Sequence, residues 1–164
     1  MCQLSNRLTE HKYYGTYQQL AETIKKYSSA HMLDVQRYWE VVLFSWITGN
    51  SDMHCKNFSL VDNGSGEYVL APAYDLLAVL LADPEDTEEM AMSFTVGGGK
   101  NGFDRHTFMT AFTQSGIPAA VADKMIERMK GYLPVWRELI GQSFLPDKMK
   151  ADYCRLLEKR IKLL

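Results

Sequence analysis

Apolar residues recur every three or four positions along most of the chain, which is the spacing of one face of an α-helix. The strongest stretch carries Val35, Tyr38, Trp39, Val42, Leu43 and Trp46. Asp34 is predicted to cap this helix and Gly49 to terminate it. An earlier helix is predicted over 17–28, because Thr16 and Gln19 form a capping-box pattern ahead of an apolar stripe. That stripe consists of Tyr17, Leu20, Ile24 and Tyr27.

The C-terminal part of the chain predicts three more helices. One lies near 104–115, and the other two begin at Pro118 and Pro146, since proline suits the first turn of a helix. The helix after Pro118 has Val121, Ala122, Met125, Met129 and Tyr132 as its buried stripe. The last helix carries Met149, Tyr153, Leu156, Leu157 and Leu164.

The pattern changes in the middle of the chain. Phe58–Val61 and Tyr68–Leu70 are short β-prone runs, and the Asn63-Gly64 pair between them is a strong hairpin signal. Met90–Val96 alternates enough to predict another short strand. The fold class that follows is mainly α (α+β), a helical bundle with a small β-hairpin.

Two polar segments are predicted to be loops. The acidic stretch Asp83–Glu89 is expected to be exposed to solvent. Gly97–Gly102 looks superficially like a phosphate-binding loop, but Phe94 stands where the Walker pattern needs its first glycine and Asn101 follows Lys100 where it needs Ser or Thr. It is therefore interpreted as a flexible turn.

Composition narrows the class of protein. A chain of 164 residues suits one domain over 1–164, and a net charge of −2 gives no broad basic field for direct nucleic-acid binding. No apolar run approaches the ~20 residues that cross a bilayer, and the N-terminus lacks a signal-peptide pattern. A cytoplasmic protein without membrane contact is expected. Cys2, Cys55 and Cys154 are predicted to be reduced thiols rather than a disulfide framework or zinc site.

Three polar residues around the hairpin form the candidate chemistry. Asp52 and Asn57 are five positions apart, and Asp75 follows the second β-prone run. In protein kinases an aspartate at this spacing accepts the hydroxyl proton, the asparagine binds metal, and a later aspartate binds Mg²⁺. The hairpin is expected to bring Asn57 and Asp75 together as Mg²⁺ ligands. The spacing alone is also common in ordinary loops, where Asp and Asn favour turns.

Two longer motifs contain these residues. Asp52-x-His54-x-Lys56-Asn57-Phe58-Ser59 and Leu70-Ala71-Pro72-Ala73-Tyr74-Asp75-Leu76-Leu77 closely resemble the C-terminal domain of HipA-like serine/threonine kinases, the toxins of bacterial toxin–antitoxin modules. The resemblance implies a protein-kinase-like C-terminal lobe that uses ATP and Mg²⁺. It also implies the following roles: Asp52 catalytic, Asn57 and Asp75 metal ligands, His54 and Lys56 on the nucleotide phosphates or shaping the loop, and Tyr74 against the nucleotide site.

The resemblance further implies a protein substrate, which in known family members can be an aminoacyl-tRNA synthetase, and a helix-turn-helix antitoxin. HipA-like kinases place ATP-covering elements in an N-terminal lobe, and the 51 residues before Asp52 contain no segment suited to that task. The chain is therefore expected to be the C-terminal lobe alone and inactive in isolation.

Two other classes of function remain open. Aminoglycoside phosphotransferase-like or phosphoinositide-kinase-like enzymes also use an Asp and an Asn at such spacing. The former are expected to show a His-Gly-Asp lead-in, where this chain has Asn50-Ser51-Asp52. The chain could also be a non-catalytic module that binds an antitoxin.

Overall fold

The computed structural model describes residues 1–5, 11–83, 85–95 and 99–164. Its helices are α1 (Tyr17–Tyr27), α2 (His31–Thr48), α3 (Val79–Ala82), α4 (Arg105–Gln114), α5 (Ala119–Gly131), α6 (Leu133–Gln142) and α7 (Asp147–Lys162). A 3₁₀ turn covers Cys55–Asn57, and the strands are β1 (Leu60–Asp62) and β2 (Tyr68–Leu70). The prediction of a mainly helical fold with a small hairpin is confirmed. None of the described helices is long and apolar enough to cross a membrane.

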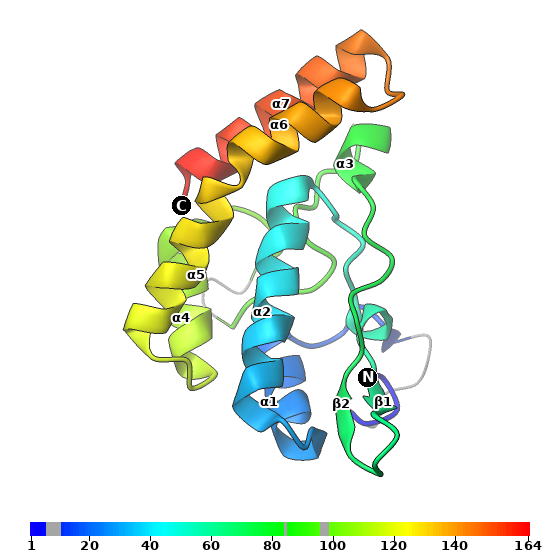
Figure 1. Cartoon of the computed structure of the whole chain (residues 1–164), viewed down its shortest axis with the longest axis vertical. Coiled ribbons are helices and arrows are strands. Elements are labelled where there is room, and N and C mark those ends of the chain that lie inside the picture. Colours follow the sequence, from blue (N-terminus) through cyan, green and yellow to red (C-terminus); the bar gives the residue numbers. More distant parts are fainter. Residues whose placement is uncertain (6–10, 84, 96–98) are drawn as a thin grey trace.

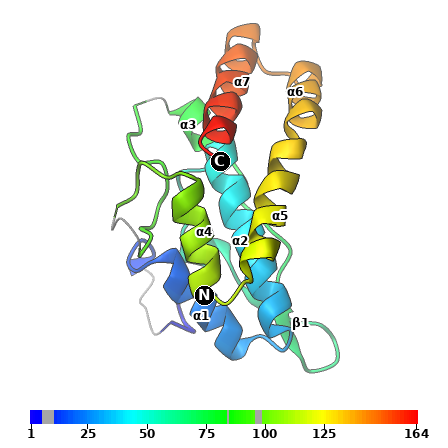
Figure 2. The same ribbon diagram turned by 90° about the vertical axis from the view of Figure 1, so that its left-hand side faces the viewer.

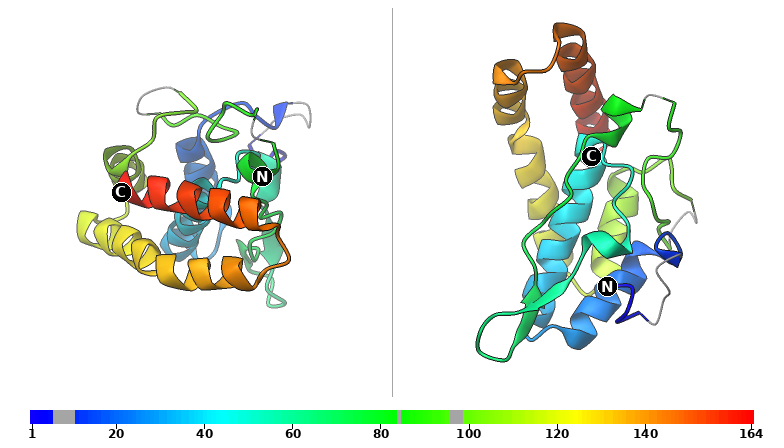
Figure 3. Two further views of the ribbon diagram at one scale, coloured as in Figure 1. Left: turned by 90° about the horizontal axis from the view of Figure 1, so that it is seen from above. Right: turned by 90° about the vertical axis from the view of Figure 1, so that its right-hand side faces the viewer.

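Helix α2 runs through the middle of the molecule (Figure 1). Helix α1 packs beside it, and α4 lies on one side of α2 while the hairpin lies on the other (Figures 1 and 2). Helices α6 and α7 run side by side across the end of α2 (Figure 3). The C-terminal end of α2, where Asp52 follows, is thus enclosed by packed elements.

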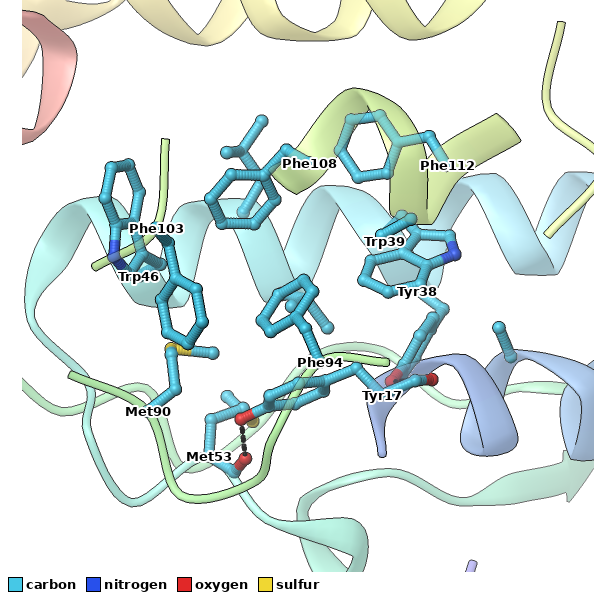
Figure 4. Packing of buried hydrophobic residues seen from close by; sticks show 14 of the residues in the cluster. Tyr17, Tyr38, Trp39, Trp46, Met53, Met90, Phe94, Phe103, Phe108 and Phe112 are labelled. Atoms are coloured by element: carbon cyan, nitrogen blue, oxygen red, sulfur yellow. Dashed lines mark hydrogen bonds between the residues drawn. The ribbon is translucent and has the colours of Figure 1, made fainter. Parts of the chain in front are cut away.

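The hydrophobic core centres on Phe94 (Figure 4). Its ring centroid lies 4.7 Å from that of Phe103, 5.1 Å from that of Tyr17 and 5.3 Å from that of Phe108. Trp39, from the middle of α2, is 5.9 Å away. Four different segments therefore meet at one aromatic side chain.

The segment that delivers Phe94 is not the strand predicted over Met90–Val96. Met90, Met92 and Phe94 are buried, but so is Ala91, so the burial of this segment does not follow the alternation of a strand. Among the described residues of this segment, 90–95, no strand is formed, and the one isolated bridge joins Ser93 to Thr16. Val96 lies outside the described residues.

The two predicted loops, Gly97–Gly102 and Asp83–Glu89, are confirmed only in part. Of the predicted turn Gly97–Gly102, the first two residues lie outside the described residues, and 99–101 form bends. In the acidic stretch, Pro84 is likewise outside the described residues. Asp83 and Glu85 are exposed as predicted, whereas Glu89 turns inward and binds Trp46 and Arg160.

Helix boundaries were predicted well where a cap or glycine marks them. The Thr16–Gln19 capping box is present, and Gly49 ends α2 in the left-handed conformation with φ 78°. The prediction of Asp34 as the cap of α2 was wrong, because the helix begins earlier, after Ala30, and Asp34 lies inside its first turn. Asp34 instead accepts hydrogen bonds from the Leu70 backbone N–H at 2.7 Å and the Ser28 hydroxyl at 2.6 Å.

Some predicted core positions and one hairpin boundary need correction. Tyr27, the last residue of α1, and Tyr132, at the junction of α5 and α6, are exposed. β1 starts at Leu60 and pairs Leu60 with Leu70, so Asn57 belongs to the preceding 3₁₀ turn rather than to the start of the strand. Helices α3 and α6 were not predicted. Cys2, Cys55 and Cys154 form no disulfide, and Cys55 is buried.

Candidate functional site

The loop that carries Asp52 is fixed to the core at both ends. Gly49 turns the chain out of α2 with φ +78°, a conformation that favours glycine, and a Cβ atom there would lie 2.6 Å from Leu156 Cδ2, so that side chain would have to shift. Beyond the turn, the Met53 carbonyl accepts a hydrogen bond of 2.6 Å from the Tyr17 hydroxyl (Figure 4). The Cys55 N–H donates to the Lys12 carbonyl at 3.3 Å. Asp52 therefore stands on a short, braced segment.

The Asp52 carboxylate is half-exposed and held on one side. Its Oδ1 accepts a hydrogen bond of 2.9 Å from the Tyr13 hydroxyl, while Oδ2 lies 3.9 Å from His54 Nε2. It borders a polar hollow of about 460 Å³. The hollow is lined by Tyr13, Ser51, Asp52, Val79, Asp86, Glu88, Ala91 and Lys100. A reacting group could thus approach Asp52 from solvent.

Asn57 and Asp75 meet as the sequence predicted. The Asn57 amide nitrogen donates to Asp75 Oδ2, and its amide oxygen accepts from the His54 N–H at 2.8 Å. The Asn50 side chain donates to the Asp75 carbonyl at 3.0 Å. The hairpin therefore brings together two residues that are 18 positions apart in the sequence, and a hydrogen bond joins their side chains.

The backbone at Asp75 is unusual. Among described residues other than glycine, Asp75 alone has a positive φ, of 58°. Aspartate tolerates the left-handed region better than most residues, yet the conformation still carries a cost. Such conformations cluster at functional sites, where the surrounding contacts hold them in place. The contacts from Asn50 and Asn57 provide that restraint here.

His54 is almost fully buried, and its ring faces Tyr13 edge-on at 5.3 Å. Burial lowers its pKa, and the nearby Asp52 carboxylate only partly opposes that effect. The His54 ring is therefore neutral near pH 7, and it packs against Tyr13 close to the Asp52 carboxylate. Its Nδ1 atom has no hydrogen-bond partner among the described residues.

Lys56, in the Cys55–Asn57 turn, and Tyr74, in the segment after β2, are both exposed. Lys56 is exposed on the 3₁₀ turn, where its amino group is accessible to a ligand. The Tyr74 hydroxyl donates to the Lys56 carbonyl at 2.7 Å and to Ser59 Oγ at 3.3 Å. Tyr74 thus ties the segment that carries Asp75 to the turn that carries Asn57.

Three residues at this site were missed by sequence reasoning. Tyr13 and Asn50 hold Asp52 and Asp75 as described above. Lys12 brings a positive charge nearby: a hydrogen bond with Tyr13 is the main cause that raises its pKa, with smaller contributions from the Asp52 and Asp75 charges. No periodicity marks these residues, because their partners lie tens of positions away.

The donor set suits a magnesium ion that is shared with a nucleotide. Mg²⁺ prefers oxygen ligands and keeps one or two protein groups beside phosphates and water. Asp75 offers a carboxylate, and Asn57 offers an amide oxygen that accepts from the His54 N–H and has a second lone pair. The contact between the two residues is made by the Asn57 amide nitrogen. Across residues 1–5, 11–83, 85–95 and 99–164, no cluster of three or more His, Cys, Asp or Glu could hold a metal alone. A Mg²⁺ ion held by this pair would need its remaining ligands from phosphates or water.

Comparison with known proteins identifies similar sequences. Residues 1–136 match the family described as HipA-like C-terminal domain. A Haemophilus influenzae protein named "Putative kinase" is 23% identical over 94% of this chain and 49% of its own length. The Sinorhizobium fredii protein named "Putative kinase Y4dM" is 35% identical over 52% of this chain and 21% of its own length. The chain thus spans about half or less of these relatives.

A solved structure shares the fold. HipA in the Shewanella oneidensis complex of HipA, HipB and operator DNA superposes with a TM-score of 0.76 at 16% identity. The match covers 99% of this chain and 43% of that chain. The fold of the whole chain is therefore that of a part of HipA.

Proposed function

Because the chain belongs to the HipA-like C-terminal domain family, we propose that it is the catalytic lobe of a serine/threonine protein kinase. The lobe would transfer the γ-phosphate of ATP to a protein hydroxyl. The observation that carries this proposal is the Asn57–Asp75 contact beside an accessible, braced Asp52. The "Putative kinase" names of the relatives agree with it.

Each residue has a distinct task in this proposal. Asp52 accepts the proton of the acceptor hydroxyl, since its carboxylate borders an open hollow. Asn57 and Asp75 hold Mg²⁺, which when bound neutralises charge on the transferring phosphoryl group. Lys56 is exposed and contacts the nucleotide phosphates. The buried His54 ring maintains the shape of the Asp52 loop. Tyr74 packs against the nucleotide site and stabilises the turn that carries Lys56.

The partners follow from the relatives. We propose that an N-terminal lobe, as the resemblance to HipA-like kinases implies, covers the ATP phosphates and adenine. The Shewanella HipA is found with HipB and DNA, which supports a helix-turn-helix antitoxin as a partner here. The acceptor would be a protein, with an aminoacyl-tRNA synthetase as the first candidate to assay. The 164-residue chain alone should then bind Mg·ATP weakly, and tight binding in calorimetry would contradict the need for a second lobe.

Two substitutions test the proposed roles in the full product of the gene. Asp52→Asn should lower kcat about 10²- to 10⁴-fold while Mg·ATP affinity stays near wild type, because it removes a proton acceptor. Asp75→Asn should lower both, because it removes a metal ligand. Transfer of γ-labelled phosphate to protein and calorimetric Mg·ATP binding are measured side by side.

Asp62→Asn is the matched control. It makes the same change at the tip of the same hairpin, where the remaining oxygen can still accept from the Gly64 and Gly66 N–H groups. It should leave both measurements unchanged. Wild-type transfer by the Asp52 variant would refute its catalytic role. Wild-type binding and transfer by the Asp75 variant would refute its role as a metal ligand. Absence of phosphate transfer by the unmodified protein would refute the kinase assignment and favour a non-catalytic binding module.

A further inference from the structure

The Asp52 carboxylate receives a hydrogen bond from a residue far away in sequence. Tyr13 precedes α1, Asp52 follows α2, and their side chains meet with 2.9 Å between Oη and Oδ1. We propose that Tyr13 is a positioning residue for phosphoryl transfer, which orients Asp52 so that Oδ2 receives the proton of the acceptor hydroxyl. This inference rests on the function proposed above, because it assigns Tyr13 a role through Asp52.

The two carboxylate oxygens of Asp52 have different surroundings. Oδ1 is engaged by Tyr13, whereas Oδ2 is 3.9 Å from His54 Nε2, beyond hydrogen-bond distance. The terminal torsion of an aspartate side chain is broad, so a half-exposed carboxylate turns unless one oxygen is fixed. Proton transfer depends strongly on alignment of the reacting atoms. Fixing Oδ1 therefore leaves Oδ2 available to the acceptor hydroxyl.

Tyr13 is itself held against the catalytic loop. Its ring packs edge-on against His54 at 5.3 Å, and Lys12 Nζ lies 4.5 Å from its ring centroid. The Lys12 carbonyl accepts a hydrogen bond from the Cys55 N–H at 3.3 Å. The edge contact with His54 and the position of Lys12 over the ring face do not use the Tyr13 hydroxyl. Tyr13→Phe consequently keeps the ring in place and removes the hydrogen bonds of the hydroxyl, which are those with Asp52 and Lys12.

The test measures γ-labelled phosphate transfer from Mg·ATP to dephosphorylated casein by the full product of the gene. Tyr13→Phe should lower kcat about tenfold and leave the KM for ATP within about twofold of wild type. Its melting temperature should match that of wild type. The control is Tyr132→Phe, the same change at a tyrosine of matching exposure, 44% against 43%, at the junction of α5 and α6. This control should be fully active.

A double-mutant cycle shows whether Tyr13 acts through Asp52. In an Asp52→Asn background, Tyr13→Phe should cause no further loss of kcat, because the group that it orients is gone. A further tenfold loss in that background would overturn the proposal. So would a loss of kcat in Tyr13→Phe that is accompanied by a lower melting temperature, since the effect would then be structural.

The remaining outcomes separate this inference from the proposed function. If Asp52→Asn abolishes transfer while Tyr13→Phe keeps wild-type kcat, the kinase assignment stands and the positioning role is refuted. A lower KM for casein with an undiminished kcat would show that the Tyr13 hydroxyl competes with the acceptor, which also overturns the proposal. If Asp52→Asn transfers phosphate normally, both the proposed function and the role of Tyr13 are refuted.

Discussion

Replacing Asp34 with alanine should destabilise the fold and loosen the hairpin that leads to Asp75. Asp34 is fully buried, and its Oδ2 accepts hydrogen bonds from the Leu70 N–H and the Ser28 hydroxyl. Its Oδ1 faces Arg37 Nη1 at 3.4 Å. The side chain therefore joins the start of α2 to β2, the strand from which the chain continues to Asp75.

The expected magnitude follows from the donors that would be left without an acceptor. A buried donor that loses its partner costs about 1–3 kcal/mol. Two such donors give roughly 3 kcal/mol after allowance for water reaching Leu70, which is only partly buried. The ion pair adds little, since the Arg37 side chain is 56% exposed and exposed pairs contribute about 0–1 kcal/mol. A typical domain has only about 5–15 kcal/mol of stability in total.

Urea unfolding followed by circular dichroism measures the loss. Arg37→Ala is the control and should cost less than about 1 kcal/mol. Asp34→Asn should fall between the two, because its remaining oxygen can still accept from Leu70 and Ser28. Hydrogen exchange at the Leu70 amide should accelerate in the alanine variant. Equal losses in Asp34→Ala and Arg37→Ala would refute the reasoning, since the ion pair would then be the larger contribution.

Two further predictions concern buried charge and pH. Glu89→Ala should cost about 3–5 kcal/mol by leaving the buried Arg160 guanidinium unpaired, whereas Glu88→Ala, which breaks an exposed pair with Lys100, should cost about 1 kcal/mol or less. Thermal melts of the two variants would contradict this if their losses were equal. Because burial lowers the pKa of His54, the unfolded chain binds a proton at higher pH than the folded chain, so stability is retained above about pH 6.5 and lost as the pH falls below it. His54→Gln should reduce the difference between urea midpoints at about pH 7 and about pH 5; an unchanged difference would exclude His54 as its source.

Local signals in the sequence predicted the parts of the site that depend on nearby residues. Helical spacing and Gly49 located α2 and the turn into the Asp52 loop. The Asn63-Gly64 signal predicted the hairpin, and the hairpin brought Asn57 to Asp75. Each of these predictions rests on periodicity or turn chemistry within a few residues.

Contacts across long sequence separations could not be predicted in the same way. The hydrogen bond from Tyr13 to Asp52 depends on how α1 packs against α2. No motif or spacing near either residue in the sequence indicates this contact. Met90–Val96 shows a related limit, because an apolar pattern in the sequence indicates that a segment is buried but not whether a partner strand lies beside it. Asp34 was assigned to capping because its residue type favours caps, although its actual partner was the distant Leu70.

The most direct test of the central claim is to locate the divalent ion. The nitrogen-labelled full product of the gene is mixed with a non-hydrolysable ATP analogue and sub-stoichiometric Mn²⁺, and side-chain amide signals are followed by NMR. The Asn57 amide signal should broaden beyond detection and return with excess Mg²⁺. The control is Asn63, whose amide also donates to a carboxylate, that of Glu67, at 3.0 Å, and it should stay sharp. A sharp Asn57 signal, or equal broadening of both amides, would contradict a metal site at Asn57 and Asp75.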